Sequence, residues 1–208
     1  MSVSEERDHA VPAVQPAAVG AAAPIADPAP LGLAAFALTT FLLSVVNAHW
    51  TNGNSAGTAF LGYALAYGGI AQLLAGMWEF RNRNVFGATA FGSYGAFWLG
   101  LFVWIRVAPL RSGHDLGWIL IAWAIFNTYM LILSAQVNLA VFGVFVTLEL
   151  TEIFLAIGNF LDNGTGVLTQ IGGYLGVATA LVAWYASAAG VANGLNGRLR
   201  IPVGRGLI

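Results

Sequence analysis

The chain has 208 residues, of which 58% are hydrophobic and only 8% are charged, and its eight basic and nine acidic side chains nearly cancel. This balance excludes the large positive field with which proteins attract nucleic acid. All the basic residues are arginine and the chain contains no cysteine, which excludes a lysine Schiff base to retinal, disulfides, thiolate metal sites and cysteine nucleophiles. We expect no nucleic acid, metal or cofactor as a partner.

The first segment, residues 1–26, is rich in alanine, proline and valine and begins with the polar run Ser4–Asp8. It lacks the basic segment followed by an apolar segment that a signal peptide needs. We expect a disordered tail. Residues 27–197 are then a transmembrane domain, and residues 198–208 are a basic C-terminal tail.

Apolar stretches of membrane-spanning length follow one another along nearly the whole remaining chain. Because a bilayer core requires about 20 apolar residues per helix, we predict an all-α polytopic membrane protein with six spans and short connections. The predicted spans are Leu31–Trp50, Gly57–Phe80, Val85–Val107, Leu116–Ala135, Leu139–Leu161 and Val167–Ala192. Five tryptophans fall mostly near the predicted interfaces and fit an aromatic belt, namely Trp50, Trp78, Trp98, Trp104 and Trp118.

The arginines predict the orientation of these spans. Cytoplasmic loops carry the excess of basic residues, and only Arg106 and Arg111 fall on one side of the predicted membrane. The other six arginines fall on the opposite side, at Arg7, Arg81, Arg83, Arg198, Arg200 and Arg205. Both termini are therefore expected in the cytoplasm, where spans one, three and five begin. The expected location is a cell membrane, with the bacterial inner membrane preferred.

The first span begins with the run Asp27-Pro28-Ala29-Pro30-Leu31-Gly32-Leu33. Proline lacks the N–H that a first helical turn leaves unpaired, and Asp27 is a natural N-cap for the N–H groups that follow. An anion can use the same donors, because a helix N-terminus carries a partial positive charge. The run is either an ordinary helix start or an entrance in which Asp27, Leu31 and Gly32 lie along a substrate path.

Spans three and five begin in a similar way. Asn84 and Asn138, like Asp27, are each followed within five residues by a bulky apolar residue and a glycine. This weak repeat suggests three helical hairpins that each begin with a capped helix start on the cytoplasmic side.

Three bulky side chains lie at one depth behind these starts. Phe36 lies nine residues after the Asx residue of its span, and Tyr94 and Leu148 lie ten residues after theirs. At a helical rise of about 1.5 Å these positions are roughly 14 to 15 Å deep, about half of a bilayer core of about 30 Å. Side chains of this size at one level can close a pore by a dewetted constriction.

Three polar residues inside spans two and three are candidates for lining the same path. Gln72 follows two glycines that let another backbone approach, and its amide offers a donor and an acceptor. Thr89 and Ser93 lie four residues apart on one helix face. For Gln72 the alternative is bonding between helices, and for Thr89 and Ser93 it is a bond to their own helix backbone.

Glu149 and Glu152 fall in the middle of span five. An acidic side chain there costs about 2.5 to 3.5 kcal/mol on insertion scales, so two of them, three residues apart, need a reason. With no arginine at that depth, at least one is expected to stay protonated. The two are candidates for a proton relay. The alternatives are a hydrogen-bonded pair at an interface or a carboxyl that faces a water-filled vestibule.

Three long motifs occur in order along the chain: Pro28-Ala29-Pro30-Leu31-Gly32-Leu33, then Tyr67-Gly68-Gly69-Ile70-Ala71-Gln72 continuing to Ala75-Gly76-Met77-Trp78-Glu79-Phe80, then Phe86-Gly87-Ala88-Thr89-Ala90-Phe91 through Ser93-Tyr94-Gly95-Ala96-Phe97-Trp98. Together they resemble the acetate uptake transporter family, also called succinate/acetate:proton symporters. The likeness covers nearly the whole chain from Asp27 onward.

The resemblance implies a six-helix protomer, a homohexamer in which each protomer has its own path, and movement of acetate or succinate, often coupled to protons. It also implies a hydrophobic constriction formed by Phe36, Tyr94 and Leu148. Two features depart from the family pattern. Asp27 stands where the family has asparagine, and an ionised carboxylate there would repel an arriving anion. The intramembrane pair of glutamates in span five is the second departure.

Other functional classes are weaker. A membrane enzyme needs a nucleophile or metal constellation at depth, and the sequence has no cysteine, no histidine deep within a predicted span and no zincin motif. A scaffold does not require aligned bulky residues behind capped helix starts. The stronger alternative is a six-helix channel for a small neutral solute of the urea or amide type, although helix N-termini directed inward favour an anion.

Overall fold

The computed structural model describes residues 25–208, except residues 52, 109 and 196. The predicted tail of residues 1–26 lies outside the described residues, apart from its last two. The helices are α1 (Ala29–Asn47), α2 (Gly53–Leu65), the π-helical segment η1 (Ala66–Ala71), α3 (Gln72–Arg81), α4 (Val85–Val107), α5 (Gly113–Ser134), α6 (Leu139–Asp162) and α7 (Val167–Gly194). Because α2, η1 and α3 continue one another, the described residues contain six helical segments apolar and long enough to cross a membrane.

The predicted all-α class with six spans is confirmed, and the third span has the predicted ends, Val85–Val107. The ends of the other spans differ from the prediction by up to three residues. The start of α5 shows the reason, because Ser112, which we did not recognise as a cap, accepts a hydrogen bond from the Asp115 N–H at 3.1 Å. The helix therefore begins at Gly113 rather than at the first strongly apolar residue, Leu116.

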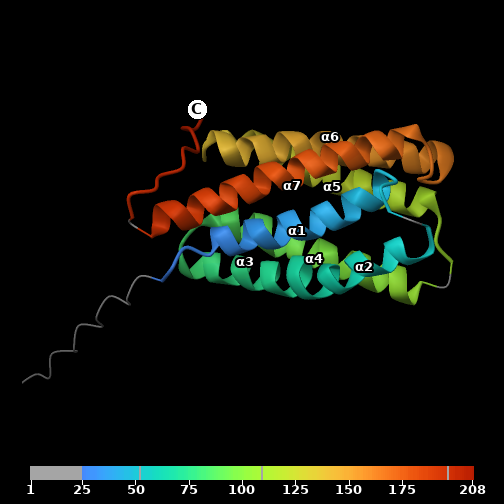
Figure 1. Cartoon of the computed structure of the whole chain (residues 1–208), viewed down its shortest axis with the longest axis horizontal. Coiled ribbons are helices and arrows are strands. Elements are labelled where there is room, and N and C mark those ends of the chain that lie inside the picture. The colour runs from blue at the N-terminus through green and yellow to red at the C-terminus, as the bar shows by residue number, and fades with distance from the viewer. Residues whose placement is uncertain (1–24, 52, 109, 196) are drawn as a thin grey trace, which may run out of the picture.

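The helices run side by side along one axis (Figure 1). Helix α5 packs against α6, α6 against α7, and α7 against α1. The segment η1 contacts both α1 and α4, and α3 packs against α4. The starts of α1, α4 and α6 lie at the same end of the bundle as the end of α7 (Figure 1). We call this end the Asp27 end.

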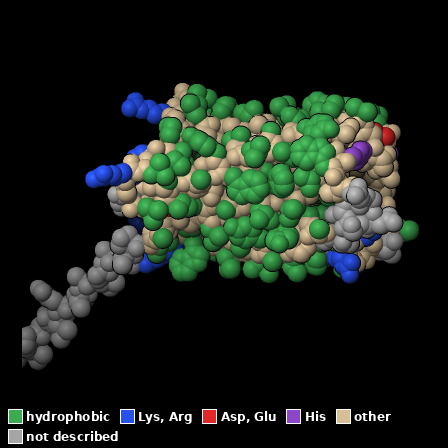
Figure 2. Space-filling model, viewed as in Figure 1, with side chains coloured by type: hydrophobic (Ala, Val, Ile, Leu, Met, Phe, Trp, Pro, Cys, Tyr) green, Lys and Arg blue, Asp and Glu red, His purple; other side chains and the backbone are tan. Residues whose placement is uncertain are grey.

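The outer surface has the distribution of a membrane protein. Hydrophobic side chains cover the middle of the face shown in Figure 2, and arginines project near the two ends of the bundle. Large apolar side chains such as Leu74, Ile125 and Leu181 are more than half exposed. In water, exposure of so many large apolar side chains would be unfavourable. A lipid environment explains their exposure.

The three predicted Asx residues all bind the backbone at their helix starts. Asn84 accepts from the Gly87 N–H at 3.0 Å and Asn138 accepts from the Val141 N–H at 2.9 Å, as N-caps of α4 and α6. Asp27 differs, because the N-cap position of α1 is Pro28. The Asp27 carboxylate accepts instead from the Ala29 N–H at 3.0 Å, two residues on, which is the geometry of an Asx turn.

The C-terminal segment after α7 is folded back onto the Asp27 end. Asn193 exchanges two hydrogen bonds with the Ile201 backbone, at 2.9 and 3.0 Å. The Val203 carbonyl accepts from the Ala140 N–H at 3.0 Å, and this N–H is one that the first turn of α6 leaves unpaired. The predicted C-terminal tail is thus held on α6 and α7.

The π-helical segment η1 lies at the glycine pair of the second span. A Cβ at Gly68 would lie 2.6 Å from the Thr39 hydroxyl on α1, so only glycine permits this approach. A π-helical turn inserts an extra residue and turns the following helix about its axis. Gln72, the first residue of α3, follows it and is directed into the bundle.

Candidate functional site

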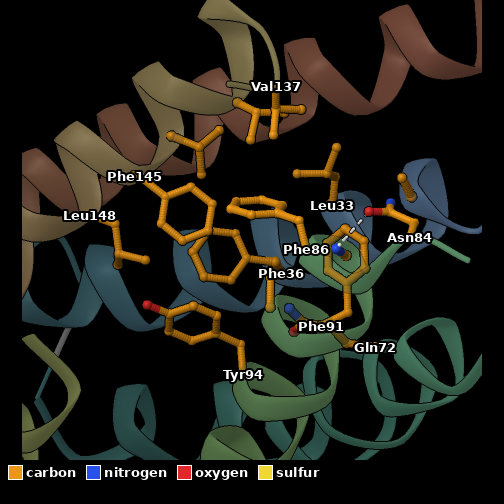
Figure 3. Close-up of a pocket in the computed structure, with 15 residues that line it drawn as sticks. Leu33, Phe36, Gln72, Asn84, Phe86, Phe91, Tyr94, Val137, Phe145 and Leu148 are labelled. Carbon is orange, nitrogen blue, oxygen red and sulfur yellow. Dashed lines mark hydrogen bonds between the residues drawn. The ribbon is translucent and has the colours of Figure 1, made fainter. Parts of the chain in front are cut away.

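The interior contains a cavity between α1, α3, α4 and α6, which we call the first cavity (Figure 3). It has a volume of about 80 Å³. Its wall is almost entirely apolar and aromatic, with Leu33, Phe36, Phe86, Phe91, Tyr94, Val141, Val144, Phe145 and Leu148 among its lining residues. The polar side chains that reach it include Gln72 and Asn84.

A second cavity, of about 50 Å³, lies farther from the Asp27 end. On α1 the lining passes from Ala29 and Leu33 in the first cavity to Thr40 and Ser44 in the second. The two cavities therefore follow one another along the helices. They have three lining residues in common, and these are Phe36, Tyr94 and Leu148.

These three side chains come from α1, α4 and α6 and form one cluster. Their exposed fractions are 4, 4 and 6%, respectively, and they belong to the same buried hydrophobic core. The rings of Phe36 and Tyr94 pack edge to face with centroids 5.6 Å apart, and Leu148 lies beside them (Figure 3). Residues selected from sequence depth thus lie together, between two cavities.

A wider hollow at the Asp27 end leads toward the first cavity. This hollow, which we call the vestibule, has a volume of about 280 Å³. It is lined by residues at the starts of α1, α4 and α6, by the α3–α4 turn and by the folded C-terminal segment, including Asp27, Asn82, Asn84, Asn138 and Val203. Ala29, Leu33, Asn84, Val137 and Val141 line both the vestibule and the first cavity. The starts of α1, α4 and α6 therefore converge on one opening.

A buried hydrogen-bond network fixes the tyrosine of the cluster. The Tyr94 hydroxyl donates to Asn127 Oδ1 at 2.9 Å, and Asn127 Nδ2 donates to the Phe145 carbonyl at 3.0 Å and to Glu149 Oε2 at 2.6 Å. The Thr128 hydroxyl donates to the other Glu149 oxygen at 2.8 Å. Glu149 is therefore held by α5 and connects through a single amide to Tyr94.

Glu152 lies in a different environment, although it is only one turn away. Its carboxyl lines the second cavity, and its Oε2 has no hydrogen-bond partner within the described part of the chain. The same holds for the Thr40 hydroxyl and the Trp98 indole nitrogen, which line the same cavity. We expected Trp98 at a membrane interface, and this was wrong, because the Trp98 ring is 2% exposed and packs inside the bundle.

The remaining predicted path residues differ in position. Gln72 is buried at the wall of the first cavity. Gly32 packs against the Phe91 ring and Leu31 lies on an outer groove beside α7, so neither lines the two cavities. Thr89 and Ser93 likewise do not line them. Both are half-buried and lie beside the face of α4 that carries the lining residues Ala90, Phe91 and Tyr94.

Sequence reasoning missed Asn127, Thr40 and the role of Trp98 as a cavity residue. Asn127 carried a signal, because an amide in the middle of an apolar span needs a buried partner. Thr40 and Trp98 carried none, since their helix face follows from packing that the sequence does not specify.

Comparison with known proteins gives a consistent result. The sequence matches the GPR1/FUN34/yaaH family over residues 12–205. It is 42% identical over 181 residues to Accumulation of dyads protein 2 of Saccharomyces cerevisiae, covering 82% of this chain and 63% of the relative. It is 38% identical over 199 residues to Acetate permease A of Emericella nidulans, covering 86% of this chain and 65% of the relative.

Bacterial relatives match over nearly their whole length. The Succinate-acetate/proton symporter SatP of Escherichia coli (strain K12) is 34% identical over 185 residues, covering 86% of this chain and 96% of the relative. The solved structure of the bacterial acetate channel SatP superimposes with a TM-score of 0.79 at 33% identity, covering 86% of this chain and 99% of that chain. The chain thus spans somewhat less than two thirds of the fungal relatives.

Proposed function

Because the chain belongs to the GPR1/FUN34/yaaH family, we propose that it moves small carboxylates, acetate first and succinate second, across a membrane through a path inside each protomer. The observation that carries this proposal is that two successive cavities share only Phe36, Tyr94 and Leu148 among their lining residues. The path enters at the vestibule, continues through the first cavity, and passes these three side chains into the second cavity.

The entrance favours an anion. Three helix starts face the vestibule, and each contributes the partial positive charge of a helix N-terminus. Asp27 is the opposing feature, because its exposed carboxylate lies at the same opening. Gln72, at the wall of the first cavity, has a carbonyl oxygen without a partner among the described residues and can hydrogen-bond a solute or its water. Asp27 and Gln72 are the polar path residues that we retain.

The cluster of Phe36, Tyr94 and Leu148 acts as a constriction. Apolar side chains in contact expel water, and a dry segment is a barrier to a hydrated anion until the side chains separate. The edge-to-face contact of Phe36 and Tyr94 is maintained by the Asn127 bond to the Tyr94 hydroxyl. A small carboxylate passes when Phe36 and Leu148 change rotamer.

We assign proton handling to Glu149 and Glu152. Both carboxyls lie within the membrane-spanning helix α6, where a permanent charge is costly. Glu149 is bonded to Asn127 and Thr128, and Glu152 faces the second cavity. Glutamine at either position preserves size and hydrogen bonding while it removes titration, so the pH dependence of acetate uptake should flatten. An unchanged pH profile in both variants would rule out proton handling by these residues.

The assembly is a homohexamer in the bacterial inner membrane, with both termini in the cytoplasm. The exposed groove of Ala96, Gly100 and Trp104 on α4, beside α5, offers small residues for close contact with a second copy. Native mass spectrometry in detergent tests the hexamer, and a monomer would contradict it.

Five arginines lie on exposed positions at the Asp27 end and two at the other end, in agreement with a cytoplasmic Asp27 end. The orientation is testable because the natural chain has no cysteine. A membrane-impermeant maleimide added to intact cells should label Leu110→Cys, at an exposed position beyond α4, but not Leu207→Cys near the C-terminus. After lysis both should react. The reverse pattern in intact cells would place the termini outside.

The transport proposal is tested by uptake of labelled acetate into proteoliposomes, with and without an inward proton gradient. Acetate should accumulate above the level of empty liposomes, and an imposed gradient should increase the initial rate. Labelled urea should enter no faster than into empty liposomes. Urea flux without acetate flux would replace the proposal with the neutral-solute channel.

A further inference from the structure

The C-terminal segment, residues 198–208, has a defined position on the bundle. It crosses from the end of α7 to the start of α6 (Figure 1). In addition to the bonds described above, the Tyr185 hydroxyl donates to the Pro202 carbonyl. The Leu207 N–H donates to the Ala135 carbonyl at 2.6 Å. The fold therefore determines which side chains of this segment face outward.

The segment exposes two kinds of large side chain. Three are arginines and three are apolar side chains that are more than half exposed, namely Arg198, Arg200, Arg205, Leu199, Leu207 and Ile208. The partly buried positions Ile201 and Val203 alternate with exposed ones and face the bundle. Large apolar side chains gathered on a short exposed segment mark an interaction surface.

The segment also lies at the more positive end of the molecule. Three of the five exposed arginines at the Asp27 end belong to it. The acidic side chains described at this end are Asp27 and Glu79, and Glu79 is fully buried. At the other end, the two arginines are balanced by Asp115 and Asp162. An excess of one sign at one end attracts a partner of the opposite charge.

The position of the segment identifies a membrane surface as that partner. Pro202 is bonded to Tyr185, which is exposed on the outer face of α7. Leu181 lies one turn before Tyr185 on the same face, and it is one of the apolar side chains that a lipid environment explains. The C-terminal segment therefore lies along the border of the apolar surface that faces lipid.

The two kinds of side chain match the two layers of a lipid surface. Exposed leucine and isoleucine enter the boundary of the acyl chains, while the long arginine side chains reach the headgroups. Arg200 donates to the Asn193 carbonyl at 2.5 Å, which uses one of the five N–H groups of a guanidinium. A free anion such as phosphate would leave the three apolar side chains in water.

We propose that the C-terminal segment is a docking surface for anionic phospholipids of the leaflet at the Asp27 end. Its three arginines bind the negatively charged headgroups, and its three exposed apolar side chains lie at the acyl boundary. Val203, between them, lines the vestibule, so bound lipid holds one wall of the vestibule in place. Lipid docking is independent of the proposed transport function, because it can be measured whatever solute the bundle moves.

Native mass spectrometry of the purified full-length protein tests the proposal. The delipidated protein is titrated with phosphatidylglycerol or with phosphatidylcholine of the same acyl chains, and the bound lipids are counted. The natural protein should retain phosphatidylglycerol at lower lipid concentration than phosphatidylcholine. Combining Arg198→Gln, Arg200→Gln and Arg205→Gln should weaken phosphatidylglycerol binding by roughly 10- to 100-fold and leave phosphatidylcholine binding nearly unchanged. Equal retention of the two lipids by the natural protein would overturn the proposal.

Two matched sets of variants separate this surface from fold and from general charge. Lysine at the same three positions keeps the charge and should keep most of the preference for phosphatidylglycerol. Arg81→Gln with Arg83→Gln removes two exposed arginines from the same end but none from the segment, and it should reduce the preference much less. A reduction as large as that of the triple glutamine variant would show binding to diffuse charge and would overturn the docking surface.

The apolar half of the surface is tested with an environment-sensitive dye on Leu199→Cys, because the natural chain has no cysteine. In phosphatidylglycerol nanodiscs this dye should emit at a shorter wavelength than the same dye on Leu110→Cys, an exposed position beyond α4. Emission typical of water at Leu199→Cys would place the segment away from lipid and overturn the proposal. A wavelength that depends on protein concentration in detergent would assign the surface to a second copy of the chain instead.

Discussion

The side-chain amide of Asn127 forms three hydrogen bonds, which fix its orientation. Its oxygen accepts from Tyr94, and its nitrogen donates to both the Phe145 carbonyl and Glu149. Reversing the amide would put its nitrogen against the Tyr94 hydroxyl and its oxygen against two acceptors, so the network has a single arrangement. The ring of Tyr94 is therefore fixed by α5, although no residue of α5 is among those that line the first cavity.

We predict that Asn127→Leu lowers the melting temperature in detergent and increases leakage of acetate. The substitution leaves the buried Tyr94 hydroxyl without its partner, at a cost of about 1 to 3 kcal/mol, and leaves Glu149 with only the hydrogen bond from Thr128. A released Tyr94 no longer holds the Phe36 ring in place. The melting temperature and the passive uptake rate of acetate measure the two effects.

Thr128→Val is the matched control for this prediction. It removes one hydrogen bond from Glu149 and leaves the Tyr94 bond to Asn127 in place. Its melting temperature should decrease less, and acetate leakage should not change. If Asn127→Leu and Thr128→Val behave alike, the amide does not control Tyr94.

At the residue scale, the sequence predicts side chains whose position follows from helical rise alone. Phe36, Tyr94 and Leu148 could be aligned because each follows an Asx residue at nearly the same distance. Trp98 could not be assigned, because the choice between lipid and interior depends on how α4 is rotated against α1 and α5. Such rotation is set by packing of side chains distant in the sequence.

At the scale of the secondary-structure elements, the starts of α1, α4 and α6 line the vestibule, which is the proposed entrance. Asn84 and Asn138 accept backbone N–H groups with amide oxygens, whereas Asp27 accepts one with a carboxylate oxygen. An amide and a carboxylate are comparable acceptors for backbone N–H groups. They differ in charge, and at the proposed entrance for anions we expect that difference to affect the rate of transport.

We predict that Asp27→Asn preserves the bond to Ala29 and maintains or increases acetate uptake near neutral pH. The substitution removes a negative charge from the vestibule, so the local concentration of an anion rises. Asn138→Asp is the reciprocal variant, since it keeps the cap of α6 and adds a charge. It should lower uptake, and the effect should diminish at high salt. Loss of uptake in Asp27→Asn at normal protein level would show that transport needs the carboxylate.

The π-helical segment η1 depends on close contact between Gly68 and Thr39. We predict that Gly68→Ala lowers stability by about 1 to 3 kcal/mol, the usual cost of overpacking, because the new methyl group would lie 2.6 Å from the Thr39 hydroxyl. Thermal unfolding in detergent measures the change. Adding Thr39→Ala to Gly68→Ala should recover part of the loss.

Gly62→Ala provides the control, because a Cβ there meets nothing within 4 Å. Alanine favours a helix over glycine, so this variant should be at least as stable as the natural protein. Equal melting temperatures for Gly68→Ala and Gly62→Ala would show that α1 and η1 do not need the close approach.

Among the elements, long apolar spans with Asx starts were predicted well, whereas local departures from regular helix were not. The sequence pattern indicated one helix from Gly57 to Phe80, but the structure divides it into α2, η1 and α3. The π-helical turn is stabilised by packing against the neighbouring helices α1 and α4, and it has no hydrophobic periodicity of its own in the sequence. The C-terminal segment is similar, because Val203 accepts through a backbone carbonyl that every residue has and Ile201 donates a backbone N–H that any residue except proline has.

At the scale of the whole molecule, six helices surround a line of hollows from the vestibule to the second cavity. The number of spans follows from hydrophobicity and length, so it could be read from the sequence. The order in which the helices pack could not, because each span is apolar on all sides and offers no stripe to orient it. Membrane helices select neighbours by small residues and buried polar contacts, such as Gly76 against α4 and the Asn127 network.

The central claim is that acetate crosses the bundle at the contact of Phe36, Tyr94 and Leu148. The most direct test is the initial rate of labelled acetate uptake into proteoliposomes that contain Leu148→Ala, which widens the contact, or Leu148→Trp, which fills it. Uptake should rise several-fold with alanine and fall to the level of empty liposomes with tryptophan. Leu150→Ala and Leu150→Trp, at a position on α6 that is 42% exposed, should match the natural protein. Leu148 variants that transport acetate at the natural rate would contradict the claim.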